Sequence, residues 1–205
     1  FSPDGQILAT VSNDGTVRIW NADSGDQLAE VGGSIGYSVA FSTDGRHMAT
    51  AMVDDTVWIW DTKSWNVLTK LTGHKGPVHD VAFSPDGRFL VTASDDQTSR
   101  IWDASTAEEL FILEGHTEFV RSAAFSPDGK RVVTCSWDKT TRVWDSNTGE
   151  ELVVLKENTG SVNWAGFSPD GGRIVTANSD GTARVWDVAM GEVQILLGRG
   201  SMRRA

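Results

Sequence analysis

The sequence predicts an all-β protein assembled from copies of one antiparallel unit, and three observations support this prediction. A motif of the form F-S-x-D-G recurs along the chain, at residues 1–5, 41–45, 83–87, 125–129 and 167–171. A Trp follows the Phe of each copy after 19 residues, as Trp20, Trp60, Trp102, Trp144 and Trp186. Between these positions apolar and polar residues alternate with a period of two, which is typical of half-buried strands and not of helices.

The motif repeats at an interval of 40 residues once and 42 residues three times, and the length difference falls near residues 31–34. A period near 40 is typical of stacked supersecondary units, none of which can bury its apolar face alone. We therefore expect the copies to form one another's core. The expected units are residues 1–31, 32–72, 73–114, 115–156 and 157–197, followed by a C-terminal tail at 198–205.

The third copy illustrates the strands expected in every unit. Its S-P-D-G turn suits a tight reversal, because Pro presets the turn and Gly accepts a positive φ. Four short antiparallel strands in about 40 residues are typical of one blade of a β-propeller. The expected elements are a first strand with Val78, Val81 and Phe83, a second at 89–93, a turn at 95–97, a third strand at 98–102 and a fourth at 109–113.

The first copy contains only Phe1 of its first strand, so we expect four complete blades and one blade of three strands. In a seven-bladed ring, five blades would leave a gap of ~100°. The free strand edges at such a gap are normally covered in native proteins. We therefore expect the chain to be part of a larger ring, which further sequence or a second chain completes.

Dipeptides at fixed positions in the copies identify a family resemblance. Trp-Asp pairs stand at 60–61, 102–103, 144–145 and 186–187, Trp20 is followed by Asn21 instead, and Gly-His pairs stand at 73–74 and 115–116. An Asp also precedes each repeat Trp by six residues. With these features the chain resembles WD-repeat β-propellers over essentially its whole length.

The resemblance implies a structural polar network inside each blade. A buried indole N–H needs an acceptor, a Thr hydroxyl can accept from it and donate onward, and an imidazole can link that hydroxyl to a carboxylate. The complete set is expected in two copies, as His74, Thr92, Asp96 and Trp102, and as His116, Thr134, Asp138 and Trp144. The other copies keep only Thr10, Asp14 and Trp20; Thr50, Asp54 and Trp60; and Thr176, Asp180 and Trp186. The missing His corresponds to a position near Gly32 and to Asn158, where we expect softer loops.

Other chemistry is conceivable for these side chains. An Asp-His-Thr grouping resembles a hydrolase triad, but an active site occurs once, whereas Thr, Asp and Trp recur in every copy. The four His residues lack the pairwise spacing typical of zinc sites. No stretch matches a twelve-residue calcium loop, although Asp54-Asp55 and Asp95-Asp96 offer carboxylates. We therefore expect no catalytic residues, no metal and no cofactor.

Residues that differ among the copies are expected to carry the function, because the shared residues build the scaffold. In WD-repeat propellers, the residue before the network Asp and those at the entrance of the first strand lie around the central channel, on a face that commonly binds peptides. Aromatic and Arg side chains are common anchors of interfaces. The resemblance therefore implies a binding face formed by Tyr37, His79, Asp95, Phe119, Arg121, Trp137 and Asn163.

Three further Trp residues interrupt the repeat pattern. Trp58 replaces the Arg that other copies have two residues before the repeat Trp, and we expect it to fill a gap against a neighbouring blade. Trp164 is expected on the innermost strand, where it would narrow the channel or a blade interface. Trp65 is expected on the opposite surface, as an exposed indole that marks a second contact.

The net charge argues against two kinds of partner, and the cysteine content indicates a compartment. A formal charge of −10 and a pI near 4.8 argue against a nucleic-acid or anionic-membrane surface, since both need a basic patch. Arg199, Arg203 and Arg204 are too few to form one. Cys135 is the lone cysteine, so no disulfide can form within the chain and a reducing, cytoplasmic compartment is expected. No apolar run approaches the ~20 residues of a membrane span.

Two classes of function follow from these patterns. The favoured one is a non-catalytic scaffold or adaptor that presents a rigid face to protein or peptide partners. The alternative is a propeller-based enzyme, or a sensor domain that regulates an attached catalytic domain, but no copy-specific trio of acid, base and nucleophile appears in the sequence. Since the chain opens within a repeat, we expect one module of a longer multidomain protein, with missing blades or self-association completing the ring.

Overall fold

The computed structural model describes residues 1–32, 34–156 and 158–198. Its regular secondary structure, within these residues, consists of β-strands without a helix. The strands in chain order are β1 (Ile7–Val11), β2 (Thr16–Asn21), β3 (Gln27–Gly32), β4 (Gly36–Phe41), β5 (His47–Met52), β6 (Val57–Asp61), β7 (Val67–Leu71), β8 (Val78–Phe83), β9 (Phe89–Ser94), β10 (Ser99–Asp103), β11 (Glu109–Leu113), β12 (Val120–Phe125), β13 (Arg131–Ser136), β14 (Thr141–Asp145), β15 (Glu151–Leu155), β16 (Val162–Phe167), β17 (Arg173–Asn178), β18 (Thr182–Asp187) and β19 (Glu192–Gly198).

These strands form five separate antiparallel sheets in which sequence neighbours pair. We call the sheets blade 1 (β1–β3), blade 2 (β4–β7), blade 3 (β8–β11), blade 4 (β12–β15) and blade 5 (β16–β19). Four blades have four strands and blade 1 has three, which confirms the predicted blade content.

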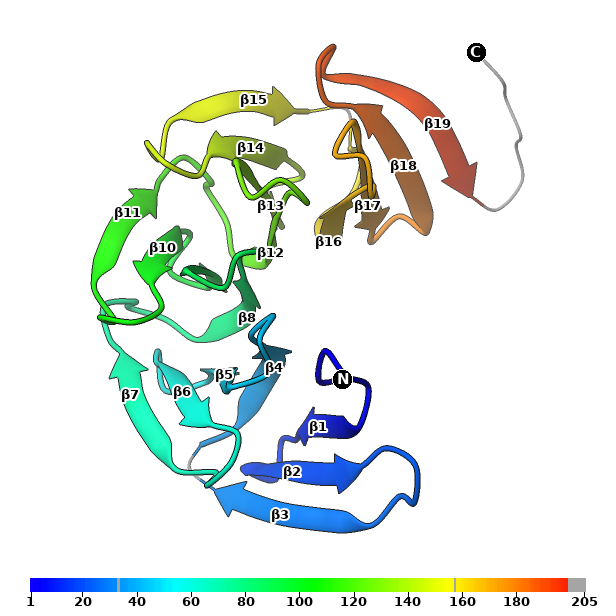
Figure 1. Ribbon diagram of the computed structural model, residues 1–205. Coiled ribbons are helices and arrows are strands. Elements are labelled where there is room, and N and C mark those ends of the chain that lie inside the picture. Colours follow the sequence, from blue (N-terminus) through cyan, green and yellow to red (C-terminus); the bar gives the residue numbers. More distant parts are fainter. Residues whose placement is uncertain (33, 157, 199–205) are drawn as a thin grey trace.

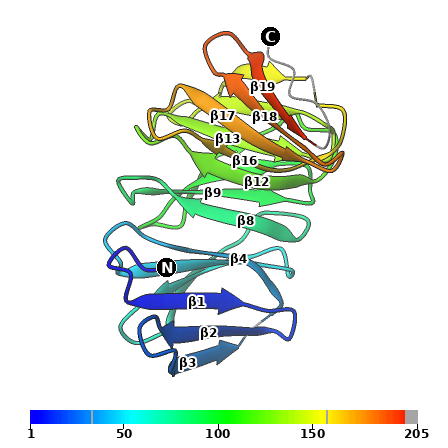
Figure 2. The ribbon, with the colours of Figure 1, turned by 90° about the vertical axis from the view of Figure 1, so that its right-hand side faces the viewer.

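The blades follow one another around an arc whose ring is not closed (Figure 1). The first strands of blades 2 to 5, namely β4, β8, β12 and β16, line the inner side of the arc and stack one above another when viewed into its opening (Figure 2). The prediction of a partial propeller is therefore confirmed. Blades 1 and 5 form the two ends of the arc, and no other blade covers their outer faces in the described chain.

The hydrophobic core is divided among the blade interfaces. Between blades 3 and 4, for example, Val91 and Leu113 of blade 3 pack with Val120, Val132 and Trp144 of blade 4, and all of these residues are buried. Similar clusters join blades 1 and 2, blades 2 and 3, and blades 4 and 5. Blades 2, 3 and 4 therefore bury both faces against neighbouring blades, and blades 1 and 5 bury one face each, as the repeat period predicts.

Two of the interrupting Trp residues lie at the interface between blades 1 and 2. Trp58 is 9% exposed and belongs to the cluster formed with Val17 and Ile19 of blade 1, as expected for a residue that fills a gap between blades. The expectation that the Trp65 indole is exposed was wrong, because its side chain is half-buried and packs against the same cluster. The loop turns through a left-handed conformation at Trp65, with φ of 55°, and its N–H donates to the Asp61 carbonyl.

The expected C-terminal tail, apart from Gly198 in β19, lies outside the described residues, as do Arg199, Arg203 and Arg204. The described residues include no helix that is long and apolar enough to cross a membrane.

Candidate functional site

Blade 3 contains a hydrogen-bonded chain that joins its third strand to the loop before its first strand. The Trp102 indole N–H donates to the Thr92 hydroxyl at 3.0 Å, and Thr92 lies 2.7 Å from His74 Nε2. On the other side of the ring, His74 Nδ1 lies 2.8 Å from the Asp96 carboxylate, which also accepts from the Lys75 backbone N–H. Because a carboxylate can only accept, the proton between His74 and Asp96 lies on Nδ1, and a neutral His74 ring would accept from the Thr92 hydroxyl at Nε2.

Blade 4 has the same arrangement, with Trp144, Thr134, His116 and Asp138 at distances of 2.8 to 2.9 Å. The pKa values of Asp96 and Asp138 lie well below their ordinary value. Burial alone would raise each pKa, but the hydrogen bond from the adjacent His, together with further donors, outweighs it by stabilising the carboxylate.

The other three blades keep the Trp-to-Thr hydrogen bond without an imidazole. Trp20 donates to Thr10, Trp60 to Thr50 and Trp186 to Thr176, at 2.9, 2.9 and 3.1 Å. In blade 5 Thr176 lies 3.5 Å from the Asn158 amide oxygen, and Asp180 is bound by Thr159 instead. Asp14 and Asp54 accept hydrogen bonds from Thr residues of their own turns, Thr16 and Thr56.

The glycine of each Gly-His pair lets the chain pass close to an ion pair. Arg100 is paired with Glu109 beside Gly73, and Arg142 with Glu151 beside Gly115. A Cβ atom on Gly73 would lie 2.7 Å from a guanidinium nitrogen of Arg100, which is closer than real Cβ contacts. A side chain larger than hydrogen would therefore displace the Arg–Glu pair or the loop that positions the following His.

The first strand of each complete blade carries a β-bulge at the same place. Pairing with the second strand skips one residue between Gly36 and Ser38, Val78 and Asp80, Val120 and Ser122, and Val162 and Trp164. A bulge leaves one residue unpaired and redirects its side chain. The bulged residues are Tyr37, His79, Arg121 and Asn163, which are the four first-strand positions of the expected binding face.

These bulged side chains contact one another across blades 2, 3 and 4. The Tyr37 ring stacks on the His79 ring, with centroids 4.5 Å apart. His79 Nε2 lies 2.6 Å from Oδ1 of Asp95, which comes from the turn between β9 and β10. A guanidinium nitrogen of Arg121 lies 2.7 Å from the same Nε2 atom and 3.7 Å from Asp95.

The contacts continue from Arg121 to blade 5. The Arg121 guanidinium lies over the Trp137 ring, 4.9 Å from its centroid, and Phe119 packs against Trp137 at 5.4 Å in a tilted geometry. The Trp137 indole N–H donates to the Asn163 side-chain oxygen at 3.3 Å. The structure thus places all seven residues in one continuous group. We call this group the inner-face cluster, consisting of Tyr37, His79, Asp95, Phe119, Arg121, Trp137 and Asn163.

Nε2 of His79 can form a hydrogen bond with only one of its two neighbours, Arg121 or Asp95, at a time. An unprotonated Nε2 accepts from Arg121, whereas a protonated Nε2 donates to Asp95. Burial lowers the pKa of His79 from its ordinary value; Asp95 opposes this shift and the Arg121 charge adds to it. The neutral ring is therefore favoured, and its Nε2 lone pair is suited to accept from Arg121.

Asp80, the residue after the His79 bulge, links three blades, and the sequence reasoning missed this role. Its carboxylate accepts from the Ser38 hydroxyl of blade 2 at 2.8 Å and from the Ala123 N–H of blade 4 at 3.2 Å. Burial raises the pKa of Asp80, with these hydrogen bonds acting in the opposite direction. The only signal in the sequence is an acidic residue where other copies have Ser38, Ser122 or Trp164.

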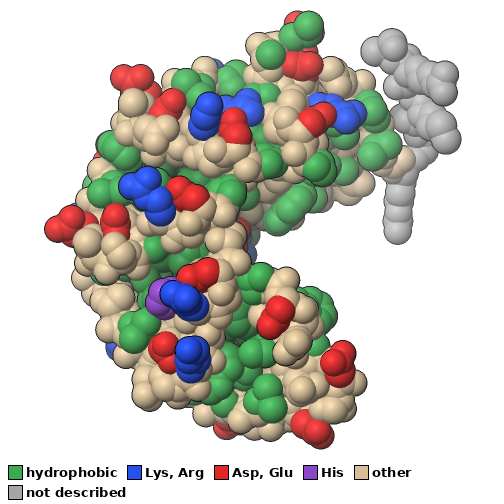
Figure 3. Space-filling view, viewed as in Figure 1, with side chains coloured by type: hydrophobic (Ala, Val, Ile, Leu, Met, Phe, Trp, Pro, Cys, Tyr) green, Lys and Arg blue, Asp and Glu red, His purple; other side chains and the backbone are tan. Residues whose placement is uncertain are grey.

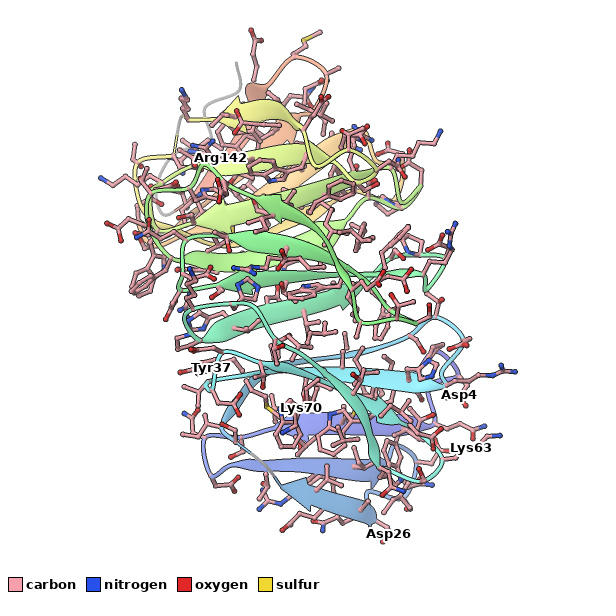
Figure 4. All side chains as sticks on the ribbon, turned by 90° about the vertical axis from the view of Figure 1, so that its left-hand side faces the viewer. Asp4, Asp26, Tyr37, Lys63, Lys70 and Arg142 are labelled. Atoms are coloured by element: carbon pink, nitrogen blue, oxygen red, sulfur yellow. The ribbon has the colours of Figure 1, made fainter. Side chains whose placement is uncertain are left out.

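The arc has a second face, opposite Tyr37. Figure 4 places Tyr37 on one face and Asp4 and Lys63 on the other. The latter face is the one in view in Figure 3, where acidic and basic side chains are interspersed over the blades. It contains a shallow pocket of about 250 Å³ between blades 2 and 3, whose lining includes His47, Arg88 and Asp103.

Trp164, unlike Trp58, is not packed into a blade interface. Its side chain is 51% exposed on β16 at the inner side of the arc. Within residues 1–32, 34–156 and 158–198, no group of three or more His, Cys, Asp or Glu side chains is arranged to hold a metal ion.

Five small antiparallel sheets in an open ring, each tied together by a Trp-to-Thr hydrogen bond, define a β-propeller segment. The family model described as "WD domain, G-beta repeat" matches residues 1–21, 27–61, 65–103, 107–145 and 149–187. The chain therefore belongs to the WD40-repeat family, whose members generally mediate protein–protein interactions and are generally non-catalytic. A comparison with curated proteins found no match.

Proposed function

We propose that this chain is a non-catalytic scaffold or adaptor module that binds a protein or peptide at its inner-face cluster. The observation that carries the proposal is the continuous contact chain from Tyr37 on blade 2 to Asn163 on blade 5. Its members are not repeated among the copies, so they are not required for the blade fold. Tyr37 and Trp137 are also 42% and 40% exposed, which leaves area for a partner.

The physical state of these side chains favours binding. Aromatic and Arg residues dominate interface hot spots, because they bury much surface for little lost freedom. Arg121 is held between His79 and Trp137, and Tyr37 is held on His79, before any partner arrives. A partner therefore has less side-chain entropy to remove on binding, and more of the contact free energy appears as affinity.

The network histidines support a structural role better than an enzymatic one. His74 and His116 are buried, and each has both ring nitrogens engaged by a Thr and an Asp. A general acid or base must reach the proton that it transfers. The same arrangement in two blades, with Trp and Thr kept in all five, fits a repeated stabilising element.

The proposed setting is a longer multidomain protein inside the cell, in which further blades or a second copy complete the ring. Cys135 is buried, and burial raises the pKa of its thiol, so it is unreactive. A single buried thiol suits a reducing compartment, where disulfides are rare.

The test is to select a displayed random-peptide library on the immobilised chain and to measure the affinity of the enriched peptides by fluorescence anisotropy. Trp137→Ala and Arg121→Ala should each weaken binding by roughly 1–3 kcal/mol, as truncation of hot-spot residues does. Lys63→Ala, which changes an exposed residue on the opposite face, is the matched control and should bind like the wild type. Loss of binding in the Lys63 variant alone would place the site on the other face and refute the proposal.

A further inference from the structure

The inner-face cluster has few binding groups that are not already used inside the protein. The Tyr37 ring stacks on His79, and the Trp137 ring contacts both Arg121 and Phe119. The Trp137 N–H donates to Asn163. A partner cation attracted to the π-faces of Tyr37 or Trp137 would have to compete with groups that already occupy them.

Asp95 is equally unsuited to bind a partner cation. Its Oδ1 atom is shielded from solvent and lies 2.6 Å from His79 Nε2. Arg121 lies 3.7 Å from the same oxygen and already supplies a positive charge. A cationic ligand would therefore meet a carboxylate that is half-enclosed and already neutralised by its neighbour.

Arg121 is the member of the inner-face cluster that has unused hydrogen-bond donors. A guanidinium carries five N–H donors, and in the described part of the chain Arg121 makes one hydrogen bond, to His79. Its side chain is 28% exposed, and its guanidinium carbon lies 4.9 Å from the centroid of the Trp137 ring. A planar guanidinium that is fixed on an aromatic ring offers paired donors, which match the two oxygens of a carboxylate.

We propose that the inner-face cluster recognises an acidic peptide, with Arg121 binding a partner carboxylate while His79 Nε2 changes from accepting from Arg121 to donating to Asp95. This inference rests on the proposed function and specifies the chemistry of its partner. The exchange keeps both charges compensated, because the partner carboxylate pairs with Arg121 and the imidazole N–H pairs with Asp95. The N–H of His79 thereby weakens the electrostatic repulsion between Asp95 and the incoming carboxylate.

In this exchange Nε2 takes its proton from solvent and the ring becomes an imidazolium, so binding is coupled to protonation of His79. The charged and titratable groups that face this imidazole are Arg121 of β12, Asp95 of the β9–β10 turn, Asp80 of its own strand and the phenol of Tyr37 on β4. When a carboxylate neutralises Arg121, the acidic neighbours dominate and the imidazolium becomes more favourable. Binding then takes up protons, so affinity increases as the pH falls from about 8 towards about 5.5, where peptide carboxylates are still ionised.

The experiment uses peptides from the same displayed library that lose binding to the Trp137→Ala variant. We expect these peptides to be enriched in Asp and Glu, and Arg121→Gln to weaken them roughly 10- to 100-fold, since Gln cannot make a charged paired contact. His79→Gln is expected to keep acidic selectivity but to remove the increase in affinity at low pH. Lys63→Ala again serves as the control.

The outcomes separate this inference from the proposed function. Enriched peptides that depend on Trp137 but are basic or neutral would overturn the acidic-peptide inference and leave the binding function intact. Acidic peptides with unchanged affinity in Arg121→Gln would overturn it as well. If no enriched peptide depends on Trp137, the proposed function itself fails. A pH response that persists in His79→Gln would refute the exchange at Nε2.

Discussion

At the scale of single residues, one Thr hydroxyl in each blade accepts the hydrogen bond from the indole N–H of the repeat Trp, which is buried in blades 2 to 5 and half-buried in blade 1. A buried N–H without an acceptor is destabilising by about 1–3 kcal/mol, and the Thr side chain provides the acceptor in all five blades. In blades 3 and 4 the hydroxyl also serves an imidazole, so that loops and strands are linked. The blades thus share one indole contact but differ in how far the network extends.

The extent of the network predicts unequal effects of the same substitution. Trp102→Phe should lower the free energy of unfolding by about 1–3 kcal/mol, because it removes the indole donor of a complete network and leaves Thr92 and His74 partly unsatisfied. Trp20→Phe should lower it less, since Trp20 is half-buried and its blade has no imidazole. Denaturant titrations of the two variants provide the comparison, and equal losses would contradict this assignment of the network.

The depressed pKa of Asp96 predicts a dependence on pH. Asp96→Asn should destabilise the protein at neutral pH, because Oδ2 of Asp96 accepts from His74 and the Lys75 N–H while Oδ1 accepts from Thr98, and an amide replaces one of these two acceptor oxygens with an NH2 donor. A carboxyl whose folded-state pKa is lowered contributes stability above its unfolded value, near 3.9, and loses it as the pH falls further. The difference between wild type and variant should therefore shrink below pH ~4. Thermal unfolding measured from pH 7 to 3 tests this, and a constant difference would argue against it.

At the scale of elements, the β-bulge is the feature that turns a repeated strand into a varied surface. The residues on either side of each bulge keep their pairing with the second strand, while the bulged residue is free to differ. Tyr, His, Arg and Asn occupy this position in blades 2 to 5. The core and the binding surface are thus separated along a single strand, which allows one to vary without disturbing the other.

Blade 1 lacks the strand that would carry such a bulge, and this predicts a difference in backbone protection. β1 pairs only with β2, whereas the equivalent β9 of blade 3 pairs with both β8 and β10. Amides of an edge strand open by local fluctuations more readily than those of a central strand. Hydrogen exchange followed by mass spectrometry should show faster exchange for β1 than for β9. Equal protection would mean that something covers the β1 edge in solution.

At the scale of the whole molecule, the open arc exposes surfaces that are interfaces elsewhere in the same chain. Four residues of blade 4 that face blade 5 are fully buried, namely Val133, Cys135, Val143 and Leu155. Their equivalents in blade 5, 42 residues later, are Val175, Ala177, Val185 and Leu197. Leu197 is 52% exposed, compared with 0% for Leu155, so the end of the arc presents an uncovered blade-binding face.

This face predicts association. The isolated chain should form larger species as its concentration increases, because apolar surface at the end of the arc becomes buried against another copy. Leu197→Lys should reduce that association without unfolding the chain, since Leu197 has little contact to lose. Light scattering after size exclusion, together with small-angle scattering, provides the test. A monodisperse monomer with the profile of a closed ring would refute both the open arc and this prediction.

The sequence by itself determined the period, the strand content of each unit and the presence of four complete blades and one incomplete blade. These features follow from local patterns, namely the alternation of apolar residues and the fixed distance from the S-x-D-G turn to the Trp, which each copy repeats. Local patterns also indicated which residues vary among the copies. They could not indicate that Trp65 packs onto the core, since this contact depends on how blades 1 and 2 stack.

Only the tertiary structure decided which of the varied residues touch. His79 and Arg121 are 42 residues apart, and Trp137 and Asn163 are 26 apart, yet each pair is in contact because neighbouring blades bring their bulges to the same edge. The bulge itself depends on pairing with a second strand, and the link from Asp80 to Ser38 and Ala123 depends on the packing of three blades. Contacts of this kind arise from the geometry of stacked sheets, which no single copy of the repeat encodes.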